Sequence, residues 1–224
     1  PLAMKAVKYK PEDFRLVQQI ALAPIAISAR KDFPPSNAQE LVSHIRQAAR
    51  DGKPVSYASV GTGSLYHLMG EDMARKIGAP MLHVPYKGGG PAVVATVSGE
   101  TALYFGGPSV VQQSRMGRLH AIATTGAKRV PALPDLPTIT EAGYGGASMS
   151  IWYGLVAPAG TPQDIVGRLN KEILRIMALP DIKERFNQLG AEAATSTPEQ
   201  FTQLVRDELA KWGKVIKAAG IKVD

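Results

Sequence analysis

The 224-residue chain contains no cysteine, which excludes disulfide bonds and thiolate chemistry. It has no apolar run near the roughly 20 residues that a membrane-spanning helix needs, so we expect no direct membrane insertion. Residues 1–4 lack the basic, apolar and small-residue pattern of a leader, and we expect any export signal to have been removed or to lie outside this chain. The hydrophobic fraction of 45% is enough for the core of one large domain or two small lobes.

The chain has no cluster of basic residues with interleaved aromatics, which is the usual signature of a nucleic-acid groove. Its formal net charge is nevertheless +7. Residues 29–124 contain ten Lys and Arg against six Asp and Glu, and the rest of the chain contains sixteen against thirteen, so the excess is spread evenly. We therefore expect no nucleic-acid partner. A diffuse positive field favours small anionic ligands, although surface charge also serves solubility.

Short apolar runs alternate with amphipathic stretches along the chain. This alternation indicates an α/β fold with a parallel or mixed sheet flanked by helices. Beside the segment at 55–67, discussed below, we expect strands at residues 22–28, 81–84, 101–105, 119–124 and 149–156.

Several helices are expected from their apolar positions and from the residues at their starts. Residues 36–39 resemble a capping box that opens a helix through Arg50. Thr161 and Thr197 are each followed by proline, which predicts a cap and a first helical residue for a helix to about Met177 and for the closing helix. The expected apolar positions are Leu41, Val42, Ile45 and Ala49 in the first helix, Val93, Val94 and Val97 in the helix after residue 90, and Phe201, Leu204, Val205, Leu209 and Trp212 in the last.

Residues 55–67, VSYASVGTGSLYH, are the most informative stretch, because a short β-type run meets a turn of glycines and hydroxyl residues that opens directly into a helix. Backbone N–H groups in such a turn have no intrahelical acceptor, and the helix dipole adds partial positive charge. A carboxylate or phosphate is favoured there. A plain strand-to-helix connection is the alternative, since its turn also favours Gly and Ser.

Catalytic and metal-binding constellations are weak, so we expect no catalytic residue, no metal and no cofactor. The histidines, His44, His67, His83 and His120, lack metal-ligand spacing. A P-loop has its glycines before the lysine, whereas here the glycines follow Lys87, so we expect no nucleotide-hydrolysing P-loop. No G-x-S-x-G motif occurs, and no acid is placed to orient His67, so a serine hydrolase using Ser64 and His67 is a remote alternative. Glycine-containing loops with donors but little proton-transfer machinery favour binding over turnover.

Ordered motifs along the chain resemble the Bug family of extracytoplasmic solute receptors, the binding proteins of tripartite tricarboxylate transporters. The resemblance runs from about Tyr9 to the C-terminus. Its motifs are Tyr57-Ala58-Ser59 with Gly61-Thr62-Gly63-Ser64 and His67-Leu68, His83-Val84-Pro85-Tyr86-Lys87-Gly88, Gly117-Arg118-Leu119, Pro131-Ala132-Leu133-Pro134-Asp135-Leu136-Pro137, and Trp152-Tyr153-Gly154-Leu155 with Ala157-Pro158-Ala159-Gly160.

This resemblance implies a two-lobed periplasmic-binding-protein (Venus flytrap) fold, in which each lobe presents a strand-turn-helix unit to a ligand carboxylate. The first lobe would comprise residues 1–28 and 125–224, and the second residues 29–124. The family's opening strand and its Pro-Gly-Gly loop ending in Asp have no counterpart in this sequence. We therefore expect the first lobe to be incomplete in this chain and to need a neighbouring chain or a separate N-terminal piece.

The resemblance also selects ligand-binding residues. They are Ser59, Gly61, Thr62, Gly63 and Ser64 in the turn, His67 in the helix, Tyr86, Lys87 and Gly88 at the neighbouring edge, and Phe105 and Gly106 beyond it. His67 either faces the ligand or packs locally, and Lys87 either adds charge to the site or lies in solvent. Gly106 stands where the family often has Asp, which favours plain carboxylates over amino acids. Trp152 and Tyr153 either floor the cleft or serve lobe packing.

The function implied is that of a periplasmic receptor, not an enzyme. It would capture a small mono- or dicarboxylate, close over it and deliver it to the membrane permease of a tripartite tricarboxylate transporter. The alternative is a ligand-sensing receptor that docks on a signalling partner without transport. Transport and sensing share every sequence feature described here, so the sequence does not distinguish them.

Overall fold

The computed structural model describes residues 7–107, 109–126, 128–129, 133–144 and 149–221. The chain divides into two compact units, Pro24–Ser150 and the pair of segments Pro1–Ala23 with Ile151–Asp224. The larger unit extends beyond residues 29–124 at both ends, and the lobe boundaries expected from the sequence stay a prediction. Each unit is described by itself below.

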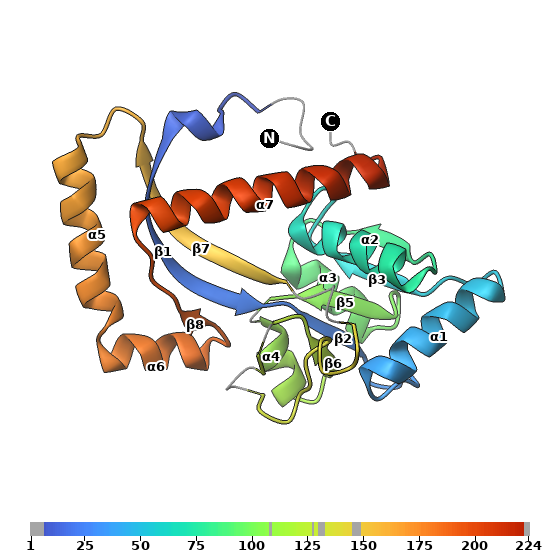
Figure 1. Cartoon of the computed structure of the whole chain (residues 1–224). Coiled ribbons are helices and arrows are strands. Elements are labelled where there is room, and N and C mark those ends of the chain that lie inside the picture. The colour runs from blue at the N-terminus through green and yellow to red at the C-terminus, as the bar shows by residue number, and fades with distance from the viewer. Residues whose placement is uncertain (1–6, 108, 127, 130–132, 145–148, 222–224) are drawn as a thin grey trace. The chain divides into compact units, whose positions relative to one another are not determined.

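The larger unit is built on a mixed five-stranded sheet (Figure 1). β3 is parallel to its neighbours β4 and β5, whereas β2 is antiparallel to β5 and β6. The carboxyl ends of β3, β4 and β5 therefore share one edge of the sheet, where the loops to the following helices begin. The strands, in spatial order, are β4 (Leu82–Pro85), β3 (Ser56–Ser59), β5 (Leu103–Gly106), β2 (Ala26–Arg30) and β6 (Leu119–Thr124).

Successive residues of the central strands point to opposite faces of this sheet. Tyr57 points towards α2, where its ring lies against Gly70. Ala58 points the other way and packs with Ala92 of α3 and Val110 of α4. Helices therefore cover both faces of the sheet at β3, as the sequence alternation predicted. The helices of this unit are α1 (Ala38–Arg50), α2 (Leu65–Ile77), α3 (Gly89–Val97) and α4 (Ser109–Arg115).

The start of α1 differs from the expected capping box by one residue. Asn37 is the cap, and its side-chain oxygen accepts from the Glu40 N–H at 2.9 Å. The Glu40 carboxylate in turn accepts from the N–H and hydroxyl of Ser36, and these hydrogen bonds lower the pKa of Glu40. The helix ends at Arg50 as predicted, and Leu41 and Ile45 are fully buried.

Two expectations about elements of the larger unit are wrong. The strand expected at residues 22–28 is two strands, β1 and β2, which belong to different sheets and are separated at Ile25. The apolar face expected for α3 is also partly misplaced, because Val93 packs on the core but Val94 is 66% and Val97 43% exposed. The buried residues of α3 are smaller: Ala92, Ala95 and Thr96.

Thr125 ties together the segments through which the chain enters and leaves the larger unit. Its side-chain oxygen accepts from the Ile25 N–H at 3.1 Å and donates to the Met149 carbonyl at 2.7 Å. Its backbone N–H donates to the Ile25 carbonyl at 2.8 Å, and its carbonyl accepts from the Met149 N–H at 2.6 Å. Thr125 is 2% exposed, so these polar groups satisfy one another away from solvent.

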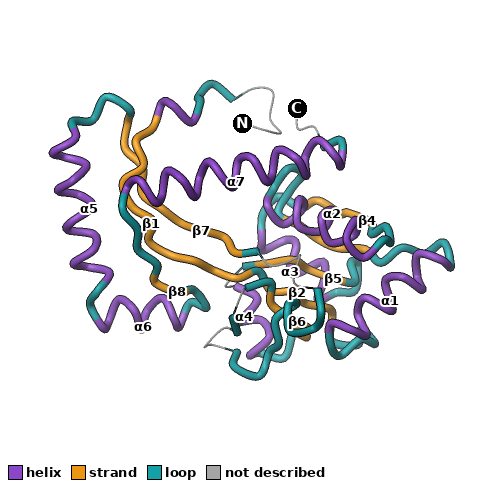
Figure 2. The backbone as a smooth tube through the Cα atoms, in the orientation of Figure 1, coloured by secondary structure: helices purple, strands orange, loops and turns teal. Residues whose placement is uncertain are grey.

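The described part of the smaller unit contains a three-stranded sheet and the helices α5, α6 and α7 (Figure 2). The strand order is β7 (Ser150–Pro158), β1 (Phe14–Pro24) and β8 (Glu192–Ala193), and a short 3-10 helix, Pro11–Asp13, precedes β1. The α-helices are α5 (Gln163–Met177), α6 (Pro180–Gln188) and α7 (Pro198–Ala219). α6 and β8 were not expected from the sequence.

Helix α7 begins as the sequence predicts. Thr197 and Gln200 form a capping box, and Phe201 is fully buried. The Phe201 ring packs against Gly154, where an added Cβ would lie 2.2 Å from it, and edge-on against Trp152 at 5.3 Å. Trp152 thus serves packing within this unit, which was one of its two expected roles.

Helix α5 starts one residue later than predicted. Pro162, not Thr161, occupies the cap position, and it makes no side-chain capping hydrogen bond. Asn170 fixes α5 to the sheet instead, because its amide group donates to the Val17 carbonyl at 2.9 Å and also contacts Gln18.

Candidate functional site

The turn between β3 and α2 has a backbone that only glycine adopts readily at two positions. Gly61 has φ +133° and Gly63 has φ +77°, both in the region that side chains with a Cβ disfavour. Ser64 then caps α2, its hydroxyl oxygen accepting from the His67 N–H at 3.3 Å. The glycine and hydroxyl residues predicted to form the turn therefore do so.

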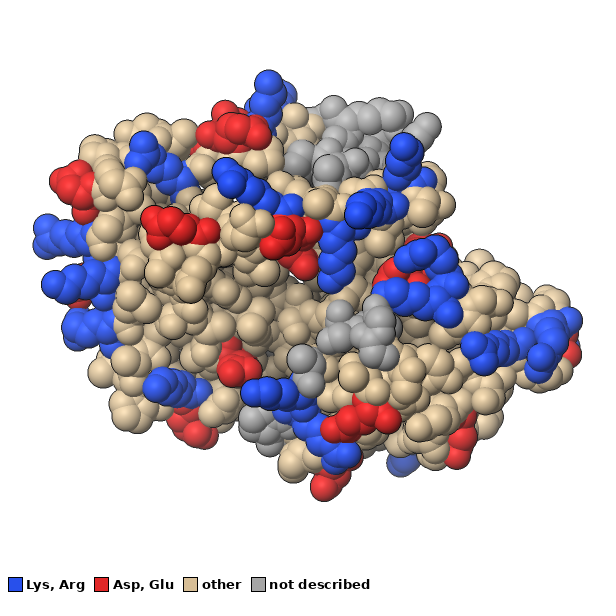
Figure 3. All heavy atoms as spheres, viewed as in Figure 1, with Lys and Arg blue, Asp and Glu red and all other residues tan. Residues whose placement is uncertain are grey.

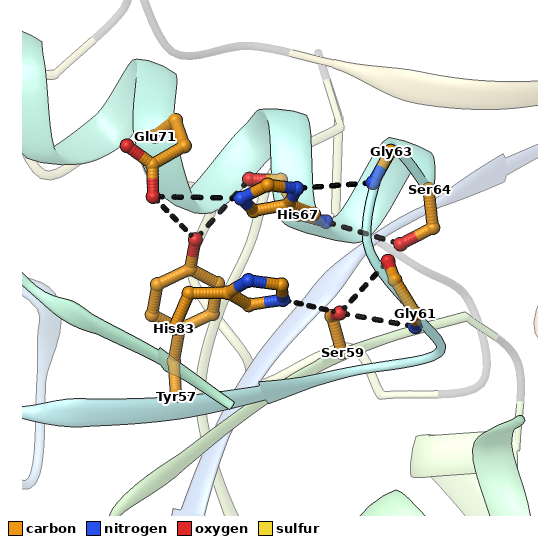
Figure 4. Close-up of polar contacts among 8 residues, drawn as sticks. All are labelled: Tyr57, Ser59, Gly61, Gly63, Ser64, His67, Glu71 and His83. Carbon is orange, nitrogen blue, oxygen red and sulfur yellow. Dashed lines mark hydrogen bonds and ion pairs between the residues drawn. The ribbon is translucent and has the colours of Figure 1, made fainter. Parts of the chain in front are cut away.

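Ser59 anchors the first half of the turn. It is fully buried at the end of β3, and its Oγ accepts from the Gly61 N–H at 3.2 Å. The same oxygen lies 2.7 Å from Nε2 of His83, which belongs to β4 (Figure 4). The Gly61 N–H is consequently satisfied inside the protein, and Ser59 acts as a support of the turn instead of one of its exposed donors.

His67 anchors the second half of the turn. Its Nδ1 accepts from the Gly63 N–H at 3.1 Å, so the neutral ring carries its hydrogen on Nε2. That Nε2 lies 3.7 Å from Oε1 of Glu71, one helical turn further on. His67 is 6% exposed. The side chain therefore packs locally, which was the alternative to its facing the ligand.

Only some of the polar groups of the turn remain as donors for an anion. The N–H groups of Gly61 and Gly63 are engaged, and the Ser64 N–H donates to the Gly61 carbonyl at 3.2 Å. The N–H groups of Thr62 and Leu65 find no acceptor among the described residues. The exposed Thr62 hydroxyl and the half-buried Ser64 hydroxyl add two side-chain donors.

The helix behind these donors adds a favourable field. α2 has no acidic residue in its first turn and carries Arg75 and Lys76 in its last turn. The positive end of its dipole is therefore not neutralised locally. A carboxylate placed against Thr62 and Leu65 would meet this end of the helix.

A stacked pair of histidines lies beneath the turn. The rings of His67 and His83 are parallel within 9°, with centroids 3.7 Å apart. Burial lowers the pKa of His67, and Glu71 opposes this shift only in part. Burial, together with repulsion from His67, lowers the pKa of His83 to about 4. Both rings are therefore neutral near pH 7.

Tyr57 completes this buried network from β3. Its hydroxyl donates to Oε1 of Glu71 at 2.9 Å and lies 3.3 Å from the His67 carbonyl (Figure 4). Its ring occupies the space above Gly70, where an added Cβ would lie 2.3 Å from ring atoms. Burial and the Glu71 carboxylate both raise the pKa of Tyr57.

Sequence reasoning missed Tyr57, Glu71 and His83 as parts of this network. One signal was present, because Glu71 follows His67 by four residues and so shares its helix face. The role of His83 depends on the parallel pairing of β3 with β4, in which Tyr57 opposes His83. That register is a tertiary feature.

The loop after β4 lies beside the turn, as predicted. The Tyr86 N–H donates to the Ser59 carbonyl at 3.0 Å, and the Tyr86 carbonyl lies 3.5 Å from the position of a Cβ on Gly61. The Tyr86 ring packs on the core cluster that contains Ala58. Lys87 is exposed, and Gly88 caps α3 with φ +111°.

Phe105 and Gly106 support the site from within the core. Phe105 is fully buried and meets the Tyr57 ring edge-on at 5.2 Å. A Cβ on Gly106 would lie 2.3 Å from the Tyr104 ring and 2.5 Å from Val110. An acid cannot simply replace Gly106 in this packing. Pro108, in the same loop, lies outside the described residues.

The geometry assembles no serine hydrolase from Ser64 and His67. The Ser64 oxygen accepts from the backbone N–H of His67. The His67 ring accepts from the Gly63 N–H at Nδ1, and its Nε2 points towards Glu71.

Among the described residues, no group of three or more His, Cys, Asp or Glu could hold a metal ion. No described helix is both long and apolar enough to cross a membrane.

Charged side chains of both signs lie on the face shown in Figure 3. Lysine and arginine side chains are interspersed with aspartate and glutamate over the visible face (Figure 3). This distribution agrees with the even spread of charge along the sequence.

Comparisons with known families decide what kind of protein carries this turn. Residues 1–221 match the family described as tripartite tricarboxylate transporter family receptor. The chain belongs to this family. The match confirms the family that the resemblance of its motifs implied.

Relatives of this receptor share about a third of its residues. A UPF0065 protein from the tcbD-tcbE intergenic region of Pseudomonas sp. strain P51 is 37% identical over 179 residues, covering 78% of this chain and 53% of the relative. BugT of Bordetella pertussis is 31% identical over 222 residues, covering 98% of this chain and 67% of BugT. The chain therefore spans only about half the length of the first of these relatives.

Solved structures of receptors share the fold. The periplasmic binding protein BugD is 35% identical with a TM-score of 0.84, and the match covers 99% of this chain and 75% of BugD. Rpa4515 of R. palustris, solved with adipate, is 32% identical with a TM-score of 0.88, and the match covers 98% of this chain and 73% of Rpa4515. MatC from Rhodopseudomonas palustris, with bound malate, is 30% identical with a TM-score of 0.79, and the match covers 94% of this chain and 72% of MatC. The mixed α/β architecture is therefore that of periplasmic binding proteins.

Proposed function

We propose that this receptor binds a small mono- or dicarboxylate at the β3–α2 turn, outside the cytoplasm, and delivers it to the permease of a tripartite tricarboxylate transporter. The proposal rests on a set of donors at one helix N-terminus that have no acceptor in the described part of the chain: the N–H groups of Thr62 and Leu65 and the hydroxyls of Thr62 and Ser64. Binding exchanges the hydration of a carboxylate for these charge-assisted hydrogen bonds.

The ligand class is supported by the relatives. Rpa4515 was solved with adipate and MatC with malate, and both are dicarboxylates. Residues 86–88, the loop between β4 and α3, follow the neighbouring strand, and Gly88 in this loop is the next expected contact.

Isothermal titration calorimetry with malate, adipate and the uncharged diamide of adipate tests the proposal. We expect at least one dicarboxylate to bind and the diamide not to bind. Gly63→Val should lower the affinity by more than about tenfold, because a β-branched residue at φ +77° distorts the turn.

The matched control is Gly52→Val. Gly52 has φ +70° and open space around its Cβ position, but it lies in the loop between α1 and β3. Both substitutions carry comparable backbone strain, so a loss of affinity confined to Gly63→Val identifies the turn as the site. Equal affinity in the Gly63 variant would place the ligand elsewhere.

A further inference from the structure

The histidines beneath the turn hold its two halves without belonging to the set of free donors. Nδ1 of His67 accepts from Gly63 at 3.1 Å, and Nε2 of His83 lies 2.7 Å from Ser59, which in turn accepts from Gly61 (Figure 4). The two rings stack at 3.7 Å. One aromatic pair, contributed by α2 and β4, therefore supports both glycines whose backbone conformation defines the turn.

We propose that His67 and His83 are positioning residues that fix the carboxylate-binding turn, and that His67 does so only while its Nδ1 is unprotonated. The proposal rests on the proposed function of this turn. It assigns a role to two side chains that do not touch the ligand, and it makes binding sensitive to acid through the protein itself.

The chemistry of Nδ1 explains the dependence on protonation. A neutral imidazole accepts at one nitrogen and donates at the other, whereas the imidazolium donates at both. Protonation of His67 would therefore set an N–H against the Gly63 N–H. The turn would lose one internal hydrogen bond and leave the Gly63 donor without its partner.

The groups around the two histidines determine the pH at which His67 becomes protonated. Oε1 of Glu71 lies 3.7 Å from Nε2 of His67 and favours its protonation, but the same carboxylate oxygen already accepts from Tyr57. The Tyr57 ring of β3 lies against His83, and Phe105 of β5 packs edge-on behind Tyr57. Burial outweighs Glu71, so His67 protonates below its ordinary pKa and the turn stays assembled at neutral pH.

Other charges on α2 do not face the stacked rings in this network. Asp72, which is 3% exposed, pairs with Arg75 at 2.8 Å and with Lys76 at 2.5 Å. Among the described residues, Glu71 is therefore the charged group in contact with the pair. The two rings also disfavour each other's protonation, since a second positive charge would lie one ring stack away.

Conservative variants separate positioning from mere packing. In His67→Asn the side-chain amide can place an oxygen near the position of Nδ1 and accept from Gly63 without titrating, whereas His67→Leu keeps bulk but no acceptor. His83→Gln and His83→Leu form the corresponding pair for Nε2. We expect the Asn and Gln variants to keep malate or adipate affinity within about threefold at pH 7, and the Leu variants to lose about tenfold or more.

The pH profile is the readout that a packing role would not change. Calorimetry with the same dicarboxylate from pH 7 to pH 5 should show a steeper loss of affinity for the wild type than for His67→Asn, and titration of the ligand is common to both. Parallel profiles would overturn the proposal, as would full affinity in His67→Leu.

Amide hydrogen exchange of Gly63, followed by NMR without ligand, tests the same role independently. Protection at pH 7 should persist in His67→Asn and disappear in His67→Leu, and acid should remove it from the wild type alone. Equal protection in His67→Leu would contradict the proposal. If exchange behaves as expected but no carboxylate binds any variant, His67 still positions the turn and the proposed function of the turn is wrong.

Discussion

The two units of the chain differ in how completely they bury their apolar side chains. In the larger unit, Ile27, Tyr57 and Phe105 of three adjacent strands are fully buried. In the smaller unit, β7 is mostly exposed and α6 has no buried residue. The larger unit can therefore hold the β3–α2 turn rigidly, because packing on both faces of its sheet fixes the side chains beneath the turn.

Helices α1 and α5 are similarly amphipathic, but they differ in how far their apolar side chains are buried. Both have regularly spaced apolar residues, but Ile45 of α1 is 0% exposed and Leu169 of α5 is 38% exposed. Periodicity thus predicts the helix and its apolar face, yet it does not predict what covers that face. The other large apolar side chains that α5 exposes are Ile165, Leu174 and Ile176.

The largest expected effect comes from truncating a buried side chain in the larger unit. Ile45→Ala should lower the free energy of unfolding of that unit by about 2–5 kcal/mol, because it removes buried methyl groups and leaves a cavity. Leu169→Ala in α5 should cost less than about 1 kcal/mol, since the side chain is already partly in water. Denaturant unfolding, with hydrogen exchange to locate the opening unit, measures both.

Comparable losses for the two variants would contradict the contrast between the units. Such a result would mean that the apolar face of α5 is covered in solution.

An intermediate effect is expected from pH in the larger unit. An unfolded histidine titrates near pH 6.5, whereas the pKa of His83 in the folded state is about 4. Between these values the unfolded chain binds more protons, so stability falls as the pH is lowered from about 6.5 to 4. With allowance for partial exposure of the ring, we expect a loss of about 2 kcal/mol.

Urea unfolding at a series of pH values measures this loss, with the His67→Asn, His83→Gln double variant as control. The double variant should show a flatter profile between pH 6.5 and 5, above the range in which carboxylates protonate. Identical profiles would show that the stacked pair does not carry the dependence.

The smallest effect is expected at a helix cap in the smaller unit. Thr197→Ala removes the side-chain acceptor of the Gln200 N–H and should lower stability by about 1 kcal/mol. Thr197→Ser keeps the hydroxyl and should stay close to the wild type. Thermal unfolding compares the two, and an alanine variant as stable as the serine variant would show that the cap contributes nothing in this unit.

Local signals predicted much of the fold. β6 occupies residues 119–124 as expected, α1 ends at Arg50 as expected, and α7 begins after the predicted cap, Thr197. The prediction of one strand at residues 22–28 was wrong, because a continuous apolar run does not show where the chain leaves one sheet and enters another. That break, at Ile25, is set by pairing with distant strands.

The candidate site was predicted in outline but not in its chemistry. The turn residues from Ser59 to Ser64 were identified, but the sequence did not show that the N–H groups of Gly61 and Gly63 are engaged inside the protein. Which N–H groups stay free depends on the glycine φ angles and on His83, which β4 brings in from across the sheet. No local pattern contains that information.

The most direct test of the account is an NMR titration of the 15N-labelled chain with malate and adipate. We predict saturable shifts centred on the amides of Thr62 and Leu65, the N–H groups that have no acceptor among the described residues. Binding with both amides unchanged, and with the largest shifts elsewhere, would contradict the assignment of the β3–α2 turn as the carboxylate site.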